Sequence, residues 1–292
     1  MSAVSTNPPP ETNSTSRTGS TLEVEAAGVP SAPTSETPAR PFALVRHSLV
    51  LAGRAITKIK RNPEQLIDVT LQPIIFTVLF VYLFGGAISG SQHDYLQYVL
   101  PALMVQTVLF VTIPIGVNLN TDIQKGVFDR FRSLPIPRSA PLVGAVLGDI
   151  VRFVTAIVVL LGFGSLIGFR IGTDPLQALA ACLLVLGFAL SLSWVSVLIG
   201  MVVREPGSVQ GIGFLLFFPL TFGSSMFVPV ETMPGWLQAW VKVNPVTQLV
   251  DAVRGLMLGG EVASPVFQSV AWAVGITVVF APLAVRAYRR RT

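Results

Sequence analysis

Two ionisable residues, Asp149 and Arg152, lie inside a long apolar run, where charge is rare and expensive. A charged side chain near the centre of a bilayer costs roughly 2.5–3.5 kcal/mol. Their spacing of three places them one helical turn apart, so that each can neutralise the other. Two roles fit this pair. It either forms part of a gate or substrate cavity, or it is a structural ion pair that faces a neighbouring helix, which is the commoner use.

A charged segment between two apolar runs, residues 124–135, is the second candidate, because its pattern is that of a short two-faced helix. One side is apolar and comprises Val127, Phe128, Phe131 and Leu134. The other side is mostly charged and comprises Lys125, Asp129, Arg130 and Arg132. Pro135 and Pro137 end the helix. Such a helix either rests on lipid headgroups or presents phenylalanines and charges to a cytoplasmic partner.

Uncharged residues in two apolar runs form a possible substrate path. Gln106 and Thr107 are polar residues within one run, and Phe214, Phe218 and Phe222 repeat every four residues in another. Lining of a cavity for a lipophilic substrate is one interpretation. Ordinary helix–helix hydrogen bonds and aromatic packing explain the same residues equally well.

Several kinds of chemistry find no support in the sequence. It contains no G-x-x-x-x-G-K-[ST], H-E-x-x-H or G-x-S-x-G pattern. The single cysteine, Cys182, lies in an apolar run, and the two histidines, His47 and His93, are far apart. We therefore expect no catalytic residue and no metal site, and a chain that is not an enzyme by itself.

The composition indicates a membrane protein. Of 292 residues, 51% are hydrophobic and only 12% are charged, against roughly 25% in soluble domains. The mean hydropathy is +0.67. The net charge of +5 does not indicate nucleic-acid binding, since the basic residues flank apolar runs instead of forming one patch.

The order of segments predicts an all-α membrane protein with a tail and one transmembrane domain. Residues 1–39 are rich in Ser, Thr and Pro, which predicts a disordered cytoplasmic tail, and residues 40–292 form the membrane domain. An amphipathic helix with a basic face, residues 41–61, is expected in the membrane interface. Six apolar runs long enough to cross the bilayer follow: 66–87, 98–119, 141–168, 176–201, 209–228 and 265–287.

The loop charges predict the orientation. Lys and Arg gather in residues 40–61, 121–140 and 286–291, whereas the alternate loops hold few. By the positive-inside bias, both termini are cytoplasmic.

The connection between the fifth and sixth runs predicts two short helices. Thr232 can cap the first, and Asn244-Pro245 can start the second, which ends at Gly259. Asp251 and Arg254, three apart in the second helix, can pair. The pair of helices forms either a re-entrant hairpin at the outer side, which we favour, or a plain extracellular loop.

Three blocks, residues 125–135, 218–237 and 244–259, carry a family resemblance. Together with the order of spans, the chain from 41 to 292 resembles the membrane subunits of ABC-2-type exporters, and among them the permeases of the daunorubicin/doxorubicin resistance group. The resemblance implies a bacterial cell-membrane permease that exports a lipophilic drug, antibiotic or lipid.

The resemblance also implies partners. The permease would pair with a second permease, identical or paralogous, in membrane lipid, and would bind two copies of a cytoplasmic ATPase subunit that holds ATP and Mg²⁺. The helix after the second span would be the coupling helix that contacts the ATPase. It comprises Gly126, Val127, Phe128, Asp129, Arg130, Phe131, Arg132 and Leu134.

Other functions remain open from the sequence. A proton-driven carrier would use Asp68 or Asp149 as its proton site. A permease for a polysaccharide or lipid-linked glycan has the same architecture, and a non-transporting scaffold would show no flux at all.

Overall fold

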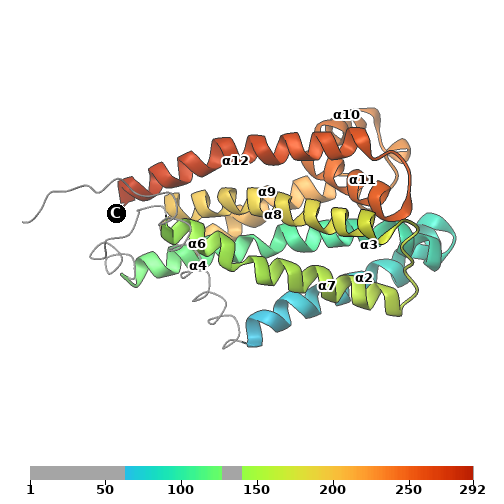
Figure 1. The fold of residues 1–292 in the computed structure, drawn as a ribbon, viewed down its shortest axis with the longest axis horizontal. Coiled ribbons are helices and arrows are strands. Elements are labelled where there is room, and N and C mark those ends of the chain that lie inside the picture. Colours follow the sequence, from blue (N-terminus) through green and yellow to red (C-terminus); the bar gives the residue numbers. More distant parts are fainter. Residues whose placement is uncertain (1–62, 127–139, 292) are drawn as a thin grey trace, which may run out of the picture. The chain divides into compact units, whose positions relative to one another are not determined.

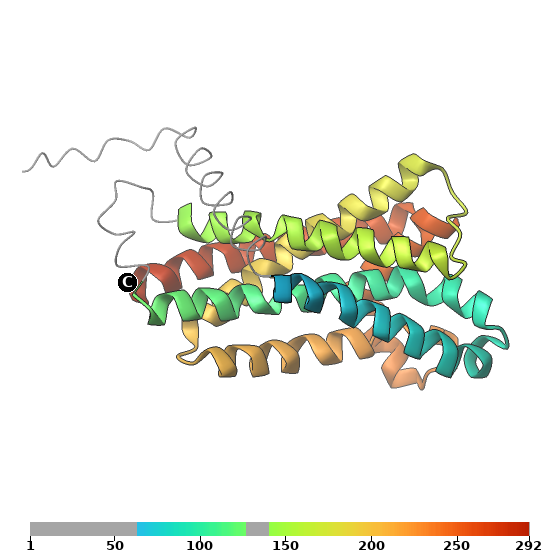
Figure 2. The same ribbon diagram turned by 90° about the horizontal axis from the view of Figure 1, so that it is seen from below.

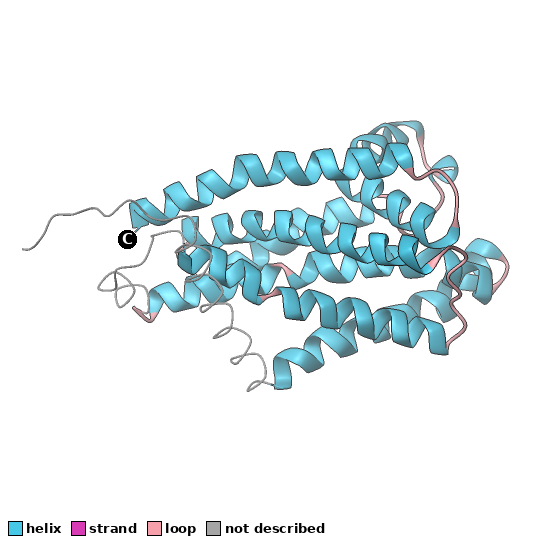
Figure 3. Ribbon diagram, viewed as in Figure 1, coloured by secondary structure: helices cyan, strands magenta, loops and turns pink. Residues whose placement is uncertain are grey.

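The computed structural model describes residues 63–126 and 140–291, and within these ranges it consists of helices and loops without a strand (Figure 3). This confirms the predicted all-α class. The helices are α2 (Pro63–Ser89), α3 (Gln92–Val111), α4 (Ile113–Gln124), α6 (Ala140–Gly148), α7 (Ile150–Leu166), α8 (Pro175–Val202), α9 (Pro206–Phe222), η1 (Val230–Thr232), α10 (Gly235–Val243), α11 (Pro245–Leu258) and α12 (Ala263–Arg291). The predicted tail (1–39), the predicted interfacial helix (41–61) and residues 127–134 of the predicted coupling helix lie outside the described residues.

Five helical stretches in the described ranges are long and apolar enough to cross a membrane: Thr70–Ile88, Gln92–Gln124, Leu142–Leu166, Pro175–Val202 and Ala263–Arg290. They correspond to predicted spans one, two, three, four and six. The chain is therefore a multi-pass membrane protein. The apolar helix α9 has 17 residues, which is about 25 Å. That length is at the lower limit for crossing the roughly 30 Å hydrocarbon core.

The predicted end of span five at residue 228 is wrong, because α9 stops at Phe222 and residues 223–229 are not helical. A side chain from a later helix accounts for this. Asn244 Nδ2 donates to the carbonyl oxygens of Leu220 (2.7 Å) and Gly223 (2.8 Å), which another helical turn would have used. The last carbonyls of α9 are therefore satisfied without a longer helix.

One of the spans is irregular in its middle. Between α3 and α4, Thr112 Oγ1 donates to the Leu109 carbonyl (2.6 Å), and Pro114 has no N–H for the Phe110 carbonyl. From α6 to α7 the helical path continues through Asp149, because Asp149 N donates to the Ala145 carbonyl (3.3 Å) and Phe153 N to the Asp149 carbonyl (3.0 Å). The sequence predicted both spans as uninterrupted runs.

The helices pack around α3, whose residues 99–106 are buried without a break and therefore on every side. Beside it, α8 packs along α12, α4 and α11. The crossing of α4 and α8 is close, since a Cβ added at Gly116 would overlap the Ser196 carbonyl oxygen. Figures 1 and 2 show these helices running side by side, with the end of α4 opposite α10 and α11.

At the end of the bundle where α12 begins, α11 packs against α3, α8, α9 and α12 (Figure 1). The loop before α8 joins it, because Gly172 N donates to the Met257 carbonyl (2.9 Å). The predicted start of α11 is confirmed: Asn244 Oδ1 accepts from Val246 N (2.9 Å). The predicted cap of the preceding helix is wrong. Helix α10 begins at Gly235 behind Pro234, and the Thr232 hydroxyl donates to the Pro229 carbonyl instead (2.7 Å).

Asn244 has two separate functions in this arrangement, and substitution can separate them. Asn244→Asp keeps the oxygen that caps α11 but removes the amide that donates to α9. We expect Asn244→Asp to lower the thermal unfolding temperature as much as Asn244→Ala, because a carboxylate cannot donate to the two carbonyls of α9. Each loss corresponds to about 1–3 kcal/mol. Thermal unfolding of the detergent-purified variants measures this loss. If Asn244→Asp unfolds at the same temperature as the native protein, the hydrogen bonds to α9 do not contribute and Asn244 acts only as the cap of α11.

Candidate functional site

A cavity of about 620 Å³ lies between α2, α3, α4, α7 and α9. It sits beside the break between α3 and α4, since Val111 and Ile113 on either side of Thr112 both line it. Its lining comprises Leu71, Gln72, Ile75, Phe76, Phe110, Val111, Ile113, Pro114, Val117, Asn118, Arg152, Gln210 and Phe214.

The lining is mostly apolar, with a few polar groups. Phe110 and Phe214 face each other with ring centroids 5.4 Å apart, and Phe76 adds a third ring. Three side-chain amides and one guanidinium supply the polar groups. A concave, largely apolar space of this size with few polar groups is the usual form of a small-molecule binding site.

The predicted pair of Asp149 and Arg152 is present as an ion pair. Arg152 Nη1 lies 3.0 Å from Asp149 Oδ1, and the two side chains are only 5% and 13% exposed. Arg152 lines the cavity and Asp149 does not. Arg152 Nε has no hydrogen-bond partner in the described part of the chain. The pair therefore neutralises one side of the guanidinium and leaves a second, buried donor without a partner among the described residues.

The residues of the predicted substrate path are found in three places. Phe214 lines the cavity, whereas Gln106 and Thr107 line an adjoining void of about 20 Å³. Phe218 and Phe222 stack on each other (4.3 Å between centroids), away from the cavity lining. Phe222 continues this stack to Phe227, which itself contacts Phe80 of α2. This second aromatic group connects Phe222 at the end of α9 to α2 through Phe227 in the non-helical segment.

Sequence reasoning missed most of the cavity lining, including the two glutamines Gln72 and Gln210 and the aromatic Phe76. A signal was present for two of them. Gln72 precedes Pro73 in an apolar run, and Gln210 lies one helical turn before Phe214. An amide on a helix facing lipid is unfavourable, so glutamines in such runs indicate a face covered by protein or water. Phe76 carries no such signal.

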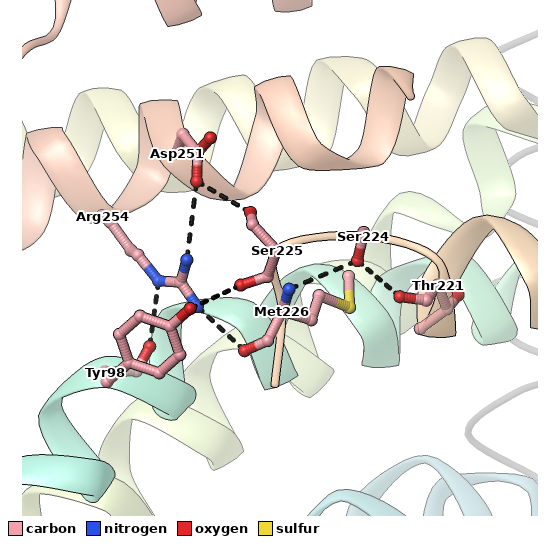
Figure 4. Close-up of polar contacts among 7 residues, drawn as sticks. All are labelled: Tyr98, Thr221, Ser224, Ser225, Met226, Asp251 and Arg254. Carbon is pink, nitrogen blue, oxygen red and sulfur yellow. Dashed lines mark hydrogen bonds and ion pairs between the residues drawn. The ribbon is translucent and has the colours of Figure 1, made fainter. Parts of the chain in front are cut away.

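The predicted pair of Asp251 and Arg254 also forms, at the end of the bundle near α11 (Figure 4). Arg254 donates from Nε to the Tyr98 carbonyl (3.0 Å) and from Nη2 to the Met226 carbonyl (2.8 Å), and its guanidinium carbon lies 3.7 Å from the centre of the Tyr98 ring. Asp251 Oδ1 lies 3.5 Å from Arg254 Nη1 and accepts from Ser225 Oγ (2.8 Å). The Tyr98 hydroxyl donates to the Ser225 carbonyl (2.8 Å).

These contacts, which we call the Arg254 cluster, join α3, α11 and the non-helical segment after α9. Burial lowers the pKa of Arg254 and raises the pKa of Asp251, while the Ser225 hydrogen bond and Arg254 act in the opposite sense on that carboxyl. Every polar group of the guanidinium faces a partner of the same chain. The cluster thus positions the segment and is separate from the cavity.

Of the predicted coupling residues, Gly126 is described. Helix α4 ends at Gln124, whose side-chain amide donates to the Arg204 carbonyl after α8 (2.8 Å). Gly126 then adopts φ +68°, a conformation that favours glycine and turns the chain out of the helix. The predicted coupling segment therefore starts close to the point where α4 is attached to the end of α8.

Comparison with known proteins agrees with this architecture. The ABC-2 type transporter family model matches residues 47–258. The chain is 43% identical over 256 residues to the daunorubicin resistance ABC transporter permease protein DrrB1 of Streptomyces coeruleorubidus, covering 88% of this chain and 90% of that protein. It is 28% identical to the probable doxorubicin resistance ABC transporter permease protein DrrC of Mycobacterium tuberculosis, covering 88% and 93%. It is 25% identical to the putative transport permease YvfS of Bacillus subtilis, covering 79% and 94%. The chain belongs to the ABC-2 type transporter family, as a permease subunit.

Proposed function

We propose that this permease carries a lipophilic small molecule, such as a drug, an antibiotic or a lipid, out of a bacterial cell, with energy from ATP hydrolysed on a separate subunit. The observation that carries the proposal is the largely apolar cavity of about 620 Å³ in a chain 43% identical to a drug-resistance permease. The space suits a lipophilic molecule of drug size.

In this proposal the energy comes from another chain, as the term ABC transporter in the names of the relatives suggests, and the sequence contains no phosphate-binding loop pattern. We infer two copies of a cytoplasmic ATPase, holding ATP and Mg²⁺, and a second permease that is identical or paralogous. The surface of α2 supports the second permease: Leu71 and Ile75 are each 51% exposed, and Gln72 beside them is exposed too. An exposed amide on that face favours coverage by protein over lipid.

In this proposal residues 40–292 form a six-span domain with cytoplasmic termini, α9 being the fifth span and α10–α11 a re-entrant hairpin at the outer side. The tail 1–39 stays outside it. Burial of α11 among four other helices supports the hairpin, since its backbone is enclosed by protein.

The path of coupling follows from α4. This helix lines the cavity with Ile113, Pro114, Val117 and Asn118, and its end leads directly into the coupling segment, Gly126 to Leu134. ATPases closing on ATP would push the segment, and α4 would carry the displacement to the cavity wall. Phe128 and Phe131 are the proposed apolar wedge, and Asp129 and Arg132 the proposed polar contacts.

Substitution of the coupling residues tests this. Phe128→Ala and Asp129→Lys should abolish ATP-dependent export in vesicles that contain the permease and its co-expressed ATPase, while the amount of inserted permease stays unchanged. The expected loss arises because the ATPase no longer engages the helix. Normal export by both variants would remove the coupling role.

The same vesicles separate the alternatives. ATP-independent flux that collapses with a protonophore would replace the exporter with a proton-driven carrier, for which Asp68 and Asp149 are the candidate sites. Export of a lipid-linked glycan with no response to lipophilic drugs would keep the ATP-driven mechanism and change the cargo.

A further inference from the structure

We propose that the cavity between α2, α3, α4, α7 and α9 binds an apolar, aromatic ligand that carries an acidic group, and that Arg152 recognises this group. The inference rests on the proposed function, because it names the chemical class of the cargo that the same cavity takes. It adds a specificity-determining residue from the third span.

Arg152 is in an unusual state for a buried guanidinium. The residue is 5% exposed, one of its terminal nitrogens is bound to Asp149, and Nε has no hydrogen-bond partner within the described residues. Buried donors are almost always satisfied in native proteins, so each exception calls for an explanation. Nε is itself fully buried, so an acceptor on a ligand in the cavity that Arg152 lines would satisfy this donor once the guanidinium turns toward the ligand.

The charge of the cavity lining favours a ligand with a negatively charged group. Arg152 is the one charged residue among the thirteen that line the cavity in the described part of the chain. Asp149 balances the charge of the pair but lies outside the lining. A carboxylate in the cavity therefore meets the cation first, in surroundings of low polarity that strengthen a charge-assisted hydrogen bond. An ammonium ion in the same place meets a like charge.

The remaining lining suits a flat aromatic body. Phe110 of α3 and Phe214 of α9 contact each other and form one aromatic wall of the cavity, and Phe76 of α2 lines it as well. Aromatic rings offer favourable edge-to-face or offset contacts to a ligand ring. Side-chain amides at Gln72, Asn118 and Gln210 can bind uncharged oxygens elsewhere on the ligand.

A purely structural pair is the competing explanation. In that case Arg152 serves to neutralise Asp149, and the cavity selects ligands by shape and hydrophobicity alone. The two explanations differ in whether an acid binds more tightly than a neutral molecule of the same shape.

The test uses three probes with one ring system: 9-anthracenecarboxylic acid, 9-anthracenemethanol and 9-(aminomethyl)anthracene. Binding to the full chain in nanodiscs of zwitterionic phosphatidylcholine is measured by fluorescence, with empty nanodiscs as the blank. We expect the acid to bind at least about tenfold more tightly than the alcohol, and the amine least tightly. Equal affinity for acid and alcohol would overturn the proposal.

Matched variants assign the selectivity to Arg152. Arg152→Gln should reduce the affinity for the acid to that for the alcohol, whereas Arg170→Gln, which removes the same charge from an exposed loop, should leave the preference intact. Phe214→Ala should lower the affinity for all three probes to a similar extent. Equal effects of the two arginine variants would contradict recognition by Arg152.

Asp149→Asn covers the case in which Arg152→Gln does not fold, because it removes the competing carboxylate and keeps the guanidinium. We expect this variant to bind the acid more tightly than the native chain does, with little change for the alcohol. Unchanged or weaker binding of the acid would overturn the proposal.

Binding in nanodiscs needs neither the ATPase nor transport, so the inference and the proposed function fail separately. Acid-selective binding without ATP-dependent export would keep the Arg152 site and remove the exporter function. ATP-dependent export without acid-selective binding would keep the exporter function and remove the Arg152 site.

Discussion

Replacing Arg254 by methionine should cause a large loss of folded protein, because the guanidinium holds together three parts of the chain that are distant in sequence. Its partners are the Tyr98 carbonyl of α3, the Met226 carbonyl of the segment after α9, and Asp251. Methionine fills similar space but leaves two carbonyls and a carboxylate without their donor. Because the Asp251 side chain is 40% exposed, most of the loss comes from the two carbonyls, and each buried acceptor left without its donor costs about 1–3 kcal/mol.

Thermal unfolding of the detergent-purified variants, followed by size-exclusion chromatography, measures this loss. Arg254→Lys should recover only part of it, since a single ammonium cannot reach the partners that the planar fork contacts together. Arg170→Met is the matched control, an exposed arginine in the loop before α8, and should unfold like the native protein. Equal stability of the Met variants at 254 and 170 would show that the cluster stabilises nothing.

The pH dependence of Arg254→Met provides a check on its mechanism. Burial already raises the pKa of Asp251, and Arg254 opposes that rise. Without the arginine, the folded-state pKa moves further above the unfolded value, so the ionised carboxylate becomes a penalty that is full above the folded pKa and disappears as the pH falls below the unfolded one. The stability deficit of Arg254→Met should therefore shrink on acidification, and Asp251→Asn in the same chain should reduce it at neutral pH.

Gly200→Ala should be strongly damaging although it adds only a single methyl group, because two helix backbones touch at this position. A Cβ at Gly200 would lie 2.5 Å from the Gly116 carbonyl oxygen and 3.0 Å from its Cα. Backbone atoms cannot move aside as a flexible side chain does, so α4 and α8 must separate. Overpacking typically costs about 1–3 kcal/mol, and displacement of two helices places this variant at the upper end.

The same helix supplies the control. Gly187 of α8 has nothing within 4 Å of an added Cβ, so Gly187→Ala should be neutral or stabilising by up to about 1 kcal/mol through helix propensity. Expression and thermal unfolding of the two alanine variants are compared directly. If Gly187→Ala and Gly200→Ala unfold at the same temperature, the close crossing of α4 and α8 does not contribute to stability.

Features that depend on neighbouring residues were predictable from the sequence. The pairs Asp149–Arg152 and Asp251–Arg254 each lie within one helical turn, and Asn244 caps the helix that follows it directly. In each case both partners are close in the chain, so spacing alone indicates the contact.

Features that depend on distant residues were not predictable. The end of α9 is set by Asn244, whose amide comes from the start of α11 and binds Leu220 and Gly223. Apolar composition continues past Phe222, so hydropathy extended the span too far. The partners of Arg254 include a carbonyl 156 residues away, and the cavity combines residues from five helices. No periodicity within one helix contains that information.

The break at Thr112 adjoins the cavity through Val111 and Ile113, while α8 runs along α4 as one helix of 28 residues. Because α4 and α8 touch backbone to backbone, a force applied at the end of α4 would act on α8 as well, and the two helices would move as one unit. The moving wall of the cavity would then be α4 together with α8, turning against α3 and α7.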